Sequence, residues 1–181
     1  MTYQMLSDLA DFATEAKGRA KVLVLTGAGK VFSAGMDLEA AQSGLPTDPV
    51  WERLSGAVAA FDGLSIAALN GTLAGGAMGM ALACDLRIAV EGAKFFYPVM
   101  KLGFLPQPSD PARLRALVGP SRAKLILMGG QKISTEEALT WGLVDRIVAG
   151  EDLMTAARDL STDTLAAQPS HIAGIKALIP V

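Results

Sequence analysis

Two glycine-bearing loops carry the residues best suited to a ligand site. They span residues 26–38 and 70–79, and each follows a short, wholly apolar run. Such runs are typical of strands buried on both faces, and ligands of layered α/β proteins bind beyond the carboxyl ends of these strands. Glycine has no Cβ, so Gly75 and Gly76 would let a ligand approach the backbone closely. Tight packing of helix on strand is an equally good explanation for both glycines.

The first loop lacks the residues that bind nucleotides. Gly29-Lys30 is followed by Val31 where a phosphate-binding loop needs Ser or Thr, and Phe32 stands where a dinucleotide-binding loop needs its third glycine. ATP and NAD are therefore not expected as ligands. Ser33 has no histidine or acid near it in the sequence to complete a nucleophilic triad, so no covalent nucleophile is expected.

The composition favours a compact cytoplasmic protein. Of 181 residues, 51% are hydrophobic, which is enough for one core. Sixteen basic and eighteen acidic side chains give a formal charge of −2, so nucleic acid is not an expected partner. The single Cys84 and single His171 cannot form an internal disulfide or a Cys/His metal site, which indicates a reducing compartment and no metal. Residues 63–84 are uncharged, but their five glycines favour a strand, turn and helix over a membrane span.

The elements that must position the loops alternate between helix and strand, which predicts an α/β fold in a single domain. Helical periodicity occurs at residues 3–17, 50–61 and 76–83, and buried-strand runs at residues 22–25, 65–69 and 86–90. Residues 1–108 are thus expected to form an α/β core and residues 109–181 a mostly helical part. The latter contains predicted helices at 111–118, 121–128, 153–166 and 169–178, a helix opened by the capping box of Ser134 and Glu137, and a strand at 144–148.

Several stretches of this chain resemble the signature segments of the crotonase superfamily, the enoyl-CoA hydratase/isomerase group. The sequence Phe-Ser-Ala-Gly-Met-Asp-Leu occupies residues 32–38, and Asn-Gly-Thr-Leu-Ala-Gly-Gly occupies residues 70–76. Further similar stretches follow in the same order at residues 84–89, 102–103, 133–134, 138–139 and 141–148. The resemblance covers nearly the whole chain and implies the ClpP/crotonase ββα-superhelix core with a helical C-terminal part.

The resemblance also implies binding of an acyl-CoA thioester, whose enolate-like state needs preorganised hydrogen-bond donors. The donors would be the backbone N–H groups of Met36 and Gly76, the latter at a helix start. Residues lining the rest of the groove would be Ala34, Gly35, Asp37, Leu38, Leu73, Gly75, Gly79, Pro98, Val99, Gly103 and Gln107. Asp37 is also well placed as a helix N-cap. Coenzyme A would enter as part of the substrate, with no further cofactor.

The chain departs from the family where hydration needs two carboxylates. Gly79 and Val99 stand at the positions to which the resemblance assigns glutamates, and Gln107 stands where isomerase and dehalogenase relatives carry an acid. Asp110 is the best remaining candidate for an acid or base, ahead of Tyr97 and Asp37. Because Asp110 lies between Ser109 and Pro111, a helix cap is the favoured interpretation of it.

Other polar and apolar residues have structural interpretations. Asp85 and Arg87 flank a predicted strand and are interpreted as a structural pair outside the site. Lys101 is expected to face solvent or a CoA phosphate. Five apolar residues could line an acyl pocket or belong to the ordinary core: Met78, Met80, Val99, Met100 and Phe104.

Three functional hypotheses follow. The first is an enzyme that stabilises a thioester enolate, and the second is a non-catalytic acyl-CoA-binding module. The third is an inactive truncated fragment, since relatives begin with an additional strand pair and continue past a position equivalent to Val181. The resemblance implies a homo-oligomer, either a trimer or a dimer of trimers, and the missing ends leave this assembly open.

Overall fold

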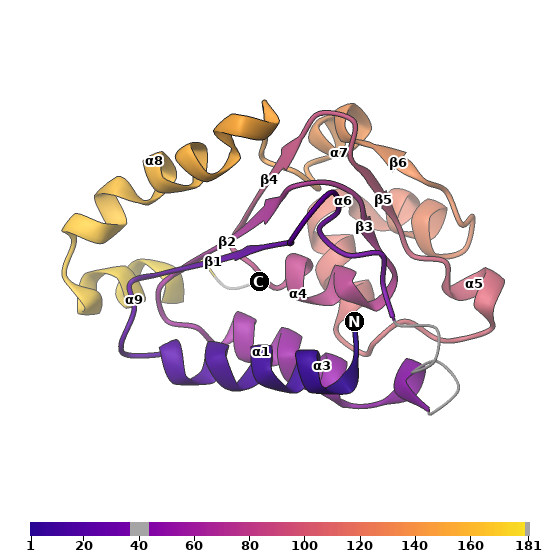
Figure 1. The fold of residues 1–181 in the computed structure, drawn as a ribbon, viewed down its shortest axis with the longest axis horizontal. Helices are drawn as coiled ribbons and strands as arrows, with labels where there is room; N and C mark the ends of the chain where they lie inside the picture. Colours follow the sequence, from indigo (N-terminus) through magenta and orange to yellow (C-terminus); the bar gives the residue numbers. More distant parts are fainter. Residues whose placement is uncertain (37–43, 180–181) are drawn as a thin grey trace.

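A four-stranded parallel sheet forms the centre of the protein (Figure 1). The computed structural model describes residues 1–36 and 44–179. The strands pair in the order β1-β2-β4-β7, with every neighbouring pair parallel. Their bounds are β1 (Val22–Thr26), β2 (Leu64–Leu69), β4 (Leu86–Val90) and β7 (Arg146–Val148). All four predicted strands are thus present, with ends that differ slightly from the apolar runs.

Alternate side chains of the sheet enter two separate cores, because successive residues of a strand point to opposite faces. Ala67 and Leu69 face the larger core, beneath α1 (Tyr3–Ala16), α3 (Val50–Ala59) and α4 (Met78–Leu82). Ile66 and Ala68 face a smaller core completed by α8 (Leu153–Ala166). Figure 1 shows α8 on the opposite side of the strands from α1 and α3. Helices on both faces explain why β2 is an unbroken apolar run.

A second, three-stranded sheet joins the two loops to the rest of the chain. It has the order β3-β5-β6, formed by β3 (Leu73–Ala74), β5 (Lys94–Phe96) and β6 (Ile133–Ser134). β3 pairs in parallel with β5, and β5 pairs antiparallel with β6. Sequence analysis did not predict this sheet because strands of two or three residues are too short to show alternation. The pairing places Tyr97, just after β5, beside the second glycine loop.

The C-terminal part is mostly helical, as predicted. α6 (Asp110–Leu127) contains Gly119 at φ 79° and ψ 167°, so the helix breaks where Gly119-Pro120 predicts. The capping box of Ser134 and Glu137 is present at the start of α7 (Thr135–Trp141), and Gly142 ends that helix at φ 81°. The remaining elements are α5 (Val99–Leu102), α9 (Pro169–Ala177) and the short 3-10 helices η1 (Leu45–Thr47), η2 (Gly75–Ala77) and η3 (Gly150–Asp152).

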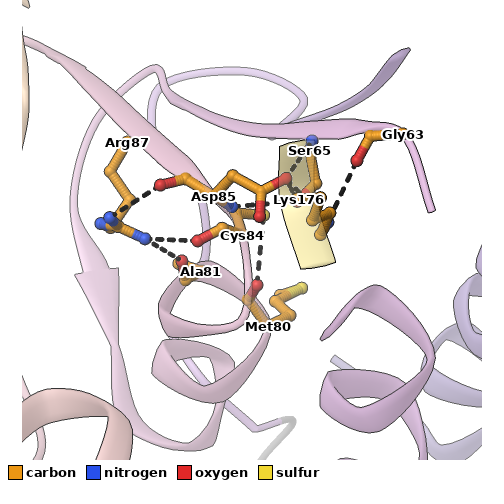
Figure 2. Close-up of polar contacts among 8 residues, drawn as sticks. All are labelled: Gly63, Ser65, Met80, Ala81, Cys84, Asp85, Arg87 and Lys176. Atoms are coloured by element: carbon orange, nitrogen blue, oxygen red, sulfur yellow. Dashed lines mark hydrogen bonds and ion pairs between the residues drawn. The ribbon is translucent and has the colours of Figure 1, made fainter. Parts of the chain in front are cut away.

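Asp85 fastens the far end of α4 to β2 and α9 (Figure 2). Its Oδ2 accepts hydrogen bonds from Ser65 N–H at 2.8 Å and Ser65 Oγ at 2.9 Å, and lies 2.8 Å from Lys176 Nζ. Arg87 instead donates to the carbonyls of Cys84 and Leu143 and forms an ion pair with Asp145 at 3.7 Å. The structural interpretation of Asp85 and Arg87 is therefore correct, but their side chains have different partners and do not pair with each other.

We expect Asp85→Ala to lower the free energy of unfolding by about 3 kcal/mol. The substitution leaves the Ser65 N–H and the partly buried Lys176 ammonium without their acceptor. Lys176→Met should cost less, because Asp85 keeps both bonds to Ser65. Urea denaturation of the two variants measures this difference, and equal losses would contradict the central role of Asp85.

Candidate functional site

The two glycine loops meet at Gly35 and Gly75. Both have positive φ, +94° and +65°, which side chains with a Cβ rarely adopt. A Cβ built on Gly75 would lie 3.6 Å from Gly35 Cα, and one built on Gly35 would lie 3.3 Å from Ala74 O. The backbones therefore touch, and the next residue in each loop is Met36 or Gly76. These are the two donors expected from the resemblance.

Backbone hydrogen bonds hold the loops side by side. Ser33 N–H donates to Thr72 O at 3.1 Å, and Ala74 N–H donates to Ser33 O at 2.9 Å. This ladder pairs Ser33 with Leu73 in parallel. Ser33 Oγ also accepts from Gly35 N–H at 3.1 Å, so the hydroxyl shapes the turn. These bonds fix the two loops next to each other, shortly before Met36 and shortly before Gly76.

Trp51 of α3 lies directly behind Gly76. A Cβ on Gly76 would come within 3.2 Å of the indole ring, which is buried and donates from Nε1 to Leu45 O at 2.9 Å. The packing explanation for Gly76 is thus correct in part, because helix contact alone disfavours a side chain there. Sequence analysis missed Trp51, since its position within an apolar helix gives no sign of contact with a residue in another loop.

Asp110 points into the core beside Gly79 and does not cap its own helix. The residue is only 1% exposed, and Tyr97 O–H donates to its Oδ2 at 3.0 Å. A Cβ on Gly79 would lie 2.7 Å from Asp110 Oδ1. Oδ1 itself is buried and has no hydrogen-bond partner among the described residues. The predicted cap is wrong: Ser109 occupies the N-cap position without capping, and its hydroxyl donates to Glu52 of α3.

Burial raises the pKa of Asp110 to about 7. The Tyr97 hydroxyl and the Arg113 charge lower the pKa, and the Glu52 charge raises it. A carboxyl group that titrates near neutral pH can accept and return protons, which suits a general acid or base. Burial and the neighbouring Asp110 charge raise the pKa of Tyr97 above its usual range, so its hydroxyl stays protonated as a donor.

The other predicted site residues have mixed placements. Asp37 and Leu38 lie outside the described residues. Leu73, Val99 and Gln107 are buried, whereas Ala34, Lys101 and Gly103 are exposed. Gly75 and Pro98 are partly exposed, and Pro98 is the N-cap of α5. Of the five suggested acyl-pocket residues, Met78, Met80 and Val99 are in the core, whereas Met100 and Phe104 are 58% and 38% exposed.

A cavity of about 600 Å³ lies away from this site, at the far end of α4. It is bordered by apolar side chains of α9 and by the Asp85–Lys176 ion pair. Its lining includes neither of the paired glycines nor Asp110. In the described part of the chain, no helix has both the length and the hydrophobicity needed to cross a membrane.

Comparison with known proteins identifies the family. The sequence profile described as enoyl-CoA hydratase/isomerase matches residues 1–179. The chain belongs to this family. Carnitinyl-CoA dehydratases of Salmonella paratyphi A and Salmonella typhi are 38% identical over 161 residues, which are 86% of this chain and 62% of theirs. This chain thus spans less than two thirds of these relatives.

Solved structures agree with this family assignment. Enoyl-CoA hydratase of Bacillus anthracis superposes with a TM-score of 0.92 at 29% identity, covering 99% of this chain and 72% of that one. DspI of Pseudomonas aeruginosa gives a TM-score of 0.88 at 33% identity, covering 96% and 70%. The fold is therefore the crotonase fold that the resemblance of the two loops implied.

Proposed function

We propose that this family member binds an acyl-CoA thioester and catalyses proton transfer at its Cα through an enolate. The backbone N–H groups of Met36 and Gly76 donate to the thioester oxygen, and Asp110 is the acid or base. One observation carries the assignment of Asp110: its carboxyl group fills the space beside Gly79, the position to which the resemblance assigns a glutamate. The carboxylate thus reaches the same region from α6 in place of α4.

The chemistry follows from these groups. As Asp110 Oδ1 takes a proton from Cα, the electron pair of the C–H bond moves into the thioester, and negative charge develops on its oxygen. The two backbone donors stabilise that charge without reorganising during the reaction. Return of the proton from Asp110 to Cα reverses the step, and return to Cγ of a 3-enoyl thioester shifts the double bond.

Isomerisation is a better fit to this site than hydration. One base suffices to move a proton between Cα and Cγ, whereas hydration requires a second group to activate water. The position that would supply it holds Val99, and Gln107 does not titrate. The carnitinyl-CoA dehydratases are relatives by sequence, but Val99 stands where the resemblance places the second acid that elimination of water needs.

A non-catalytic binding module is the second candidate. Its support is the burial of Asp110: the residue is 1% exposed, and its Oδ1 is shielded from solvent. If the thioester cannot reach Oδ1, the two backbone donors would still bind the carbonyl oxygen. Such a protein would bind acyl-CoA and release it unchanged.

One experiment separates these functions. Calorimetric titration with crotonyl-CoA measures binding, and 3-butenoyl-CoA tests turnover through the ultraviolet absorbance of the conjugated product. Binding together with conversion of 3-butenoyl-CoA to its conjugated isomer supports the isomerase. A gain in the mass of crotonyl-CoA by one water would instead support a hydratase. Binding without product supports the module, and absence of binding contradicts both proposals.

If Asp110 of α6 replaces a carboxylate at position 79 of α4, moving the carboxylate back to α4 should restore activity. Gly79→Glu alone should destabilise the protein, because its Cβ would lie 2.7 Å from Asp110 Oδ1. Combining it with Asp110→Gly removes the clash and returns a carboxylate from α4. We expect the double variant to be more stable than Gly79→Glu and at least about tenfold more active than Asp110→Gly. If the double variant loses melting temperature and rate by the sum of the two single-variant losses, the carboxylate has not been moved from α6 to α4.

We also propose that the protein acts in the cytoplasm, needs no cofactor beyond the coenzyme A of its substrate, and forms a trimer or dimer of trimers. The single Cys84 supports the reducing compartment, because one cysteine cannot form an internal disulfide. Leu102 and Leu105, 55% and 87% exposed, are available for contact between subunits. Sedimentation of the 181-residue chain tests the assembly, and a monomer at micromolar concentration would contradict it.

A further inference from the structure

We infer that Tyr97 is a positioning residue that fixes which oxygen of Asp110 reacts and sets the pH range in which it does so. This inference rests on the proposed function of Asp110 and adds a specific role for a residue that does not touch the substrate. Its basis is a short chain of hydrogen bonds from Gln107 through Tyr97 to Asp110.

The bonds give the Tyr97 hydroxyl a defined direction. Gln107 N–H donates to the phenolic oxygen at 3.4 Å, which occupies a lone pair and leaves the hydroxyl hydrogen for another acceptor. That acceptor is Asp110 Oδ2, 3.0 Å away. Asp110 N–H in turn donates to Gln107 O at 3.1 Å, so the backbone of residues 107–110 closes the ring. The ring is rigid because both Tyr97 and Asp110 are buried.

This geometry divides the two carboxylate oxygens between different tasks. Oδ2 is held by Tyr97, whereas Oδ1 is the nearer oxygen to the space beside Gly79, at 2.7 Å against 3.2 Å from a Cβ built there. Oδ1 has no hydrogen-bond partner among the described residues, so it is the oxygen free to take a proton. Without the Tyr97 bond, the carboxyl group could rotate and present either oxygen.

Two charged groups near Asp110 also shift its pKa, in opposite directions. Arg113 on the same helix favours the carboxylate, and Glu52 of α3 opposes it. α4 presents only the uncharged Gly79 at this point. Tyr97 therefore supplies the hydrogen bond that favours the ionised form directly, and it remains a donor throughout the neutral range because its own pKa is raised by burial.

Tyr97→Phe tests the inference, since it removes the hydroxyl and keeps the ring. The pKa of Asp110 should rise above its value of about 7, because a bond that favours the carboxylate is lost. Turnover of 3-butenoyl-CoA should fall about tenfold at neutral pH, with the acidic limb of its pH profile moved to higher pH. Tyr3→Phe is the control, because Tyr3 is 53% exposed on α1 and should change neither quantity.

Two readouts keep failure of this inference distinct from failure of the proposed function. Infrared difference spectra against Asp110→Asn, with isotope-labelled aspartate, report the Asp110 titration without any substrate. An unchanged Asp110 pKa in Tyr97→Phe, or an unmoved acidic limb, would overturn the role of Tyr97. If the Asp110 titration depends on Tyr97 but the wild-type protein turns over no thioester, the proposed function is overturned, and with it the part of Tyr97 in positioning a reacting oxygen.

Discussion

Asp110→Asn is expected to reduce turnover of 3-butenoyl-CoA by about 10²–10⁴-fold and to leave the Kd for acyl-CoA nearly unchanged. The amide has the shape of the carboxyl group and can still accept the Tyr97 hydrogen bond, but it cannot take a proton. The backbone donors at Met36 and Gly76 are untouched. Stopped-flow absorbance gives the rate, and calorimetry gives the Kd.

The same substitution should change how stability depends on pH. Between pH about 4 and pH about 7 the unfolded chain has released the Asp110 proton, whereas the folded protein retains it. The free energy of unfolding of the wild type should therefore fall relative to that of Asp110→Asn as pH rises through this interval. A difference of three pKa units corresponds to about 4 kcal/mol. Urea denaturation at several pH values measures the difference.

Asp159→Asn provides the matched control, because Asp159 is exposed on α8 and the charge change is the same. It should leave the rate of turnover unchanged. If Asp110→Asn lowers stability equally at all pH values and leaves the rate intact, Asp110 has only a structural role.

Gly76→Pro should reduce turnover by about 10²–10³-fold, the usual cost of losing one oxyanion donor. Proline has no N–H, but it also adds a Cβ that would press on Trp51. Gly76→Ala adds the same Cβ and keeps the N–H, so the ratio of the two rates reports the lost donor together with the constraint that the proline ring places on Gly75. We expect Gly76→Ala to lose at most about tenfold, since the indole contact of 3.2 Å requires only a small shift.

Trp51 provides a check that the loop survives in both variants. With Trp141→Phe in the background of both variants, Trp51 fluorescence and the near-ultraviolet circular dichroism should change little, and to the same extent in Gly76→Ala and Gly76→Pro. If folded Gly76→Ala and Gly76→Pro turn over substrate at equal rates, the Gly76 N–H does not contribute to catalysis. A larger Kd for acyl-CoA in Gly76→Pro alone would show that the donor also acts in the ground state.

The large elements could be predicted because each carries a local signal. The buried strands β1 and β2 are apolar runs, and α1 and α3 show helical periodicity. The break at Gly119 follows from glycine and proline chemistry alone. In contrast, β3, β5 and β6 exist because other segments offer partners, and no pattern within two or three residues reveals that pairing.

Part of the candidate site could be predicted, because its glycines also carry a local signal in the sequence. Gly75 was predicted because glycine allows a ligand to approach the backbone, and Gly35 through the family resemblance; both have positive φ in the structure. The role of Asp110 depends on contacts with Tyr97 and Gly79, which come from other elements. Its local setting between serine and proline favours a cap, and burial beside Gly79 overrides that preference. Trp51 likewise gains its position behind Gly76 only through packing of α3 on the loop.

The most direct test of the central claim is exchange of the Cα protons of butyryl-CoA in D₂O. A saturated thioester cannot be hydrated or isomerised, so mass spectrometry of the recovered ligand reports enolate formation alone. We expect deuterium uptake with the wild-type chain and a loss of about 10²-fold or more in rate with Asp110→Asn. Deuterium uptake no faster than in buffer without protein, or equal uptake with wild type and Asp110→Asn, would contradict proton transfer by Asp110.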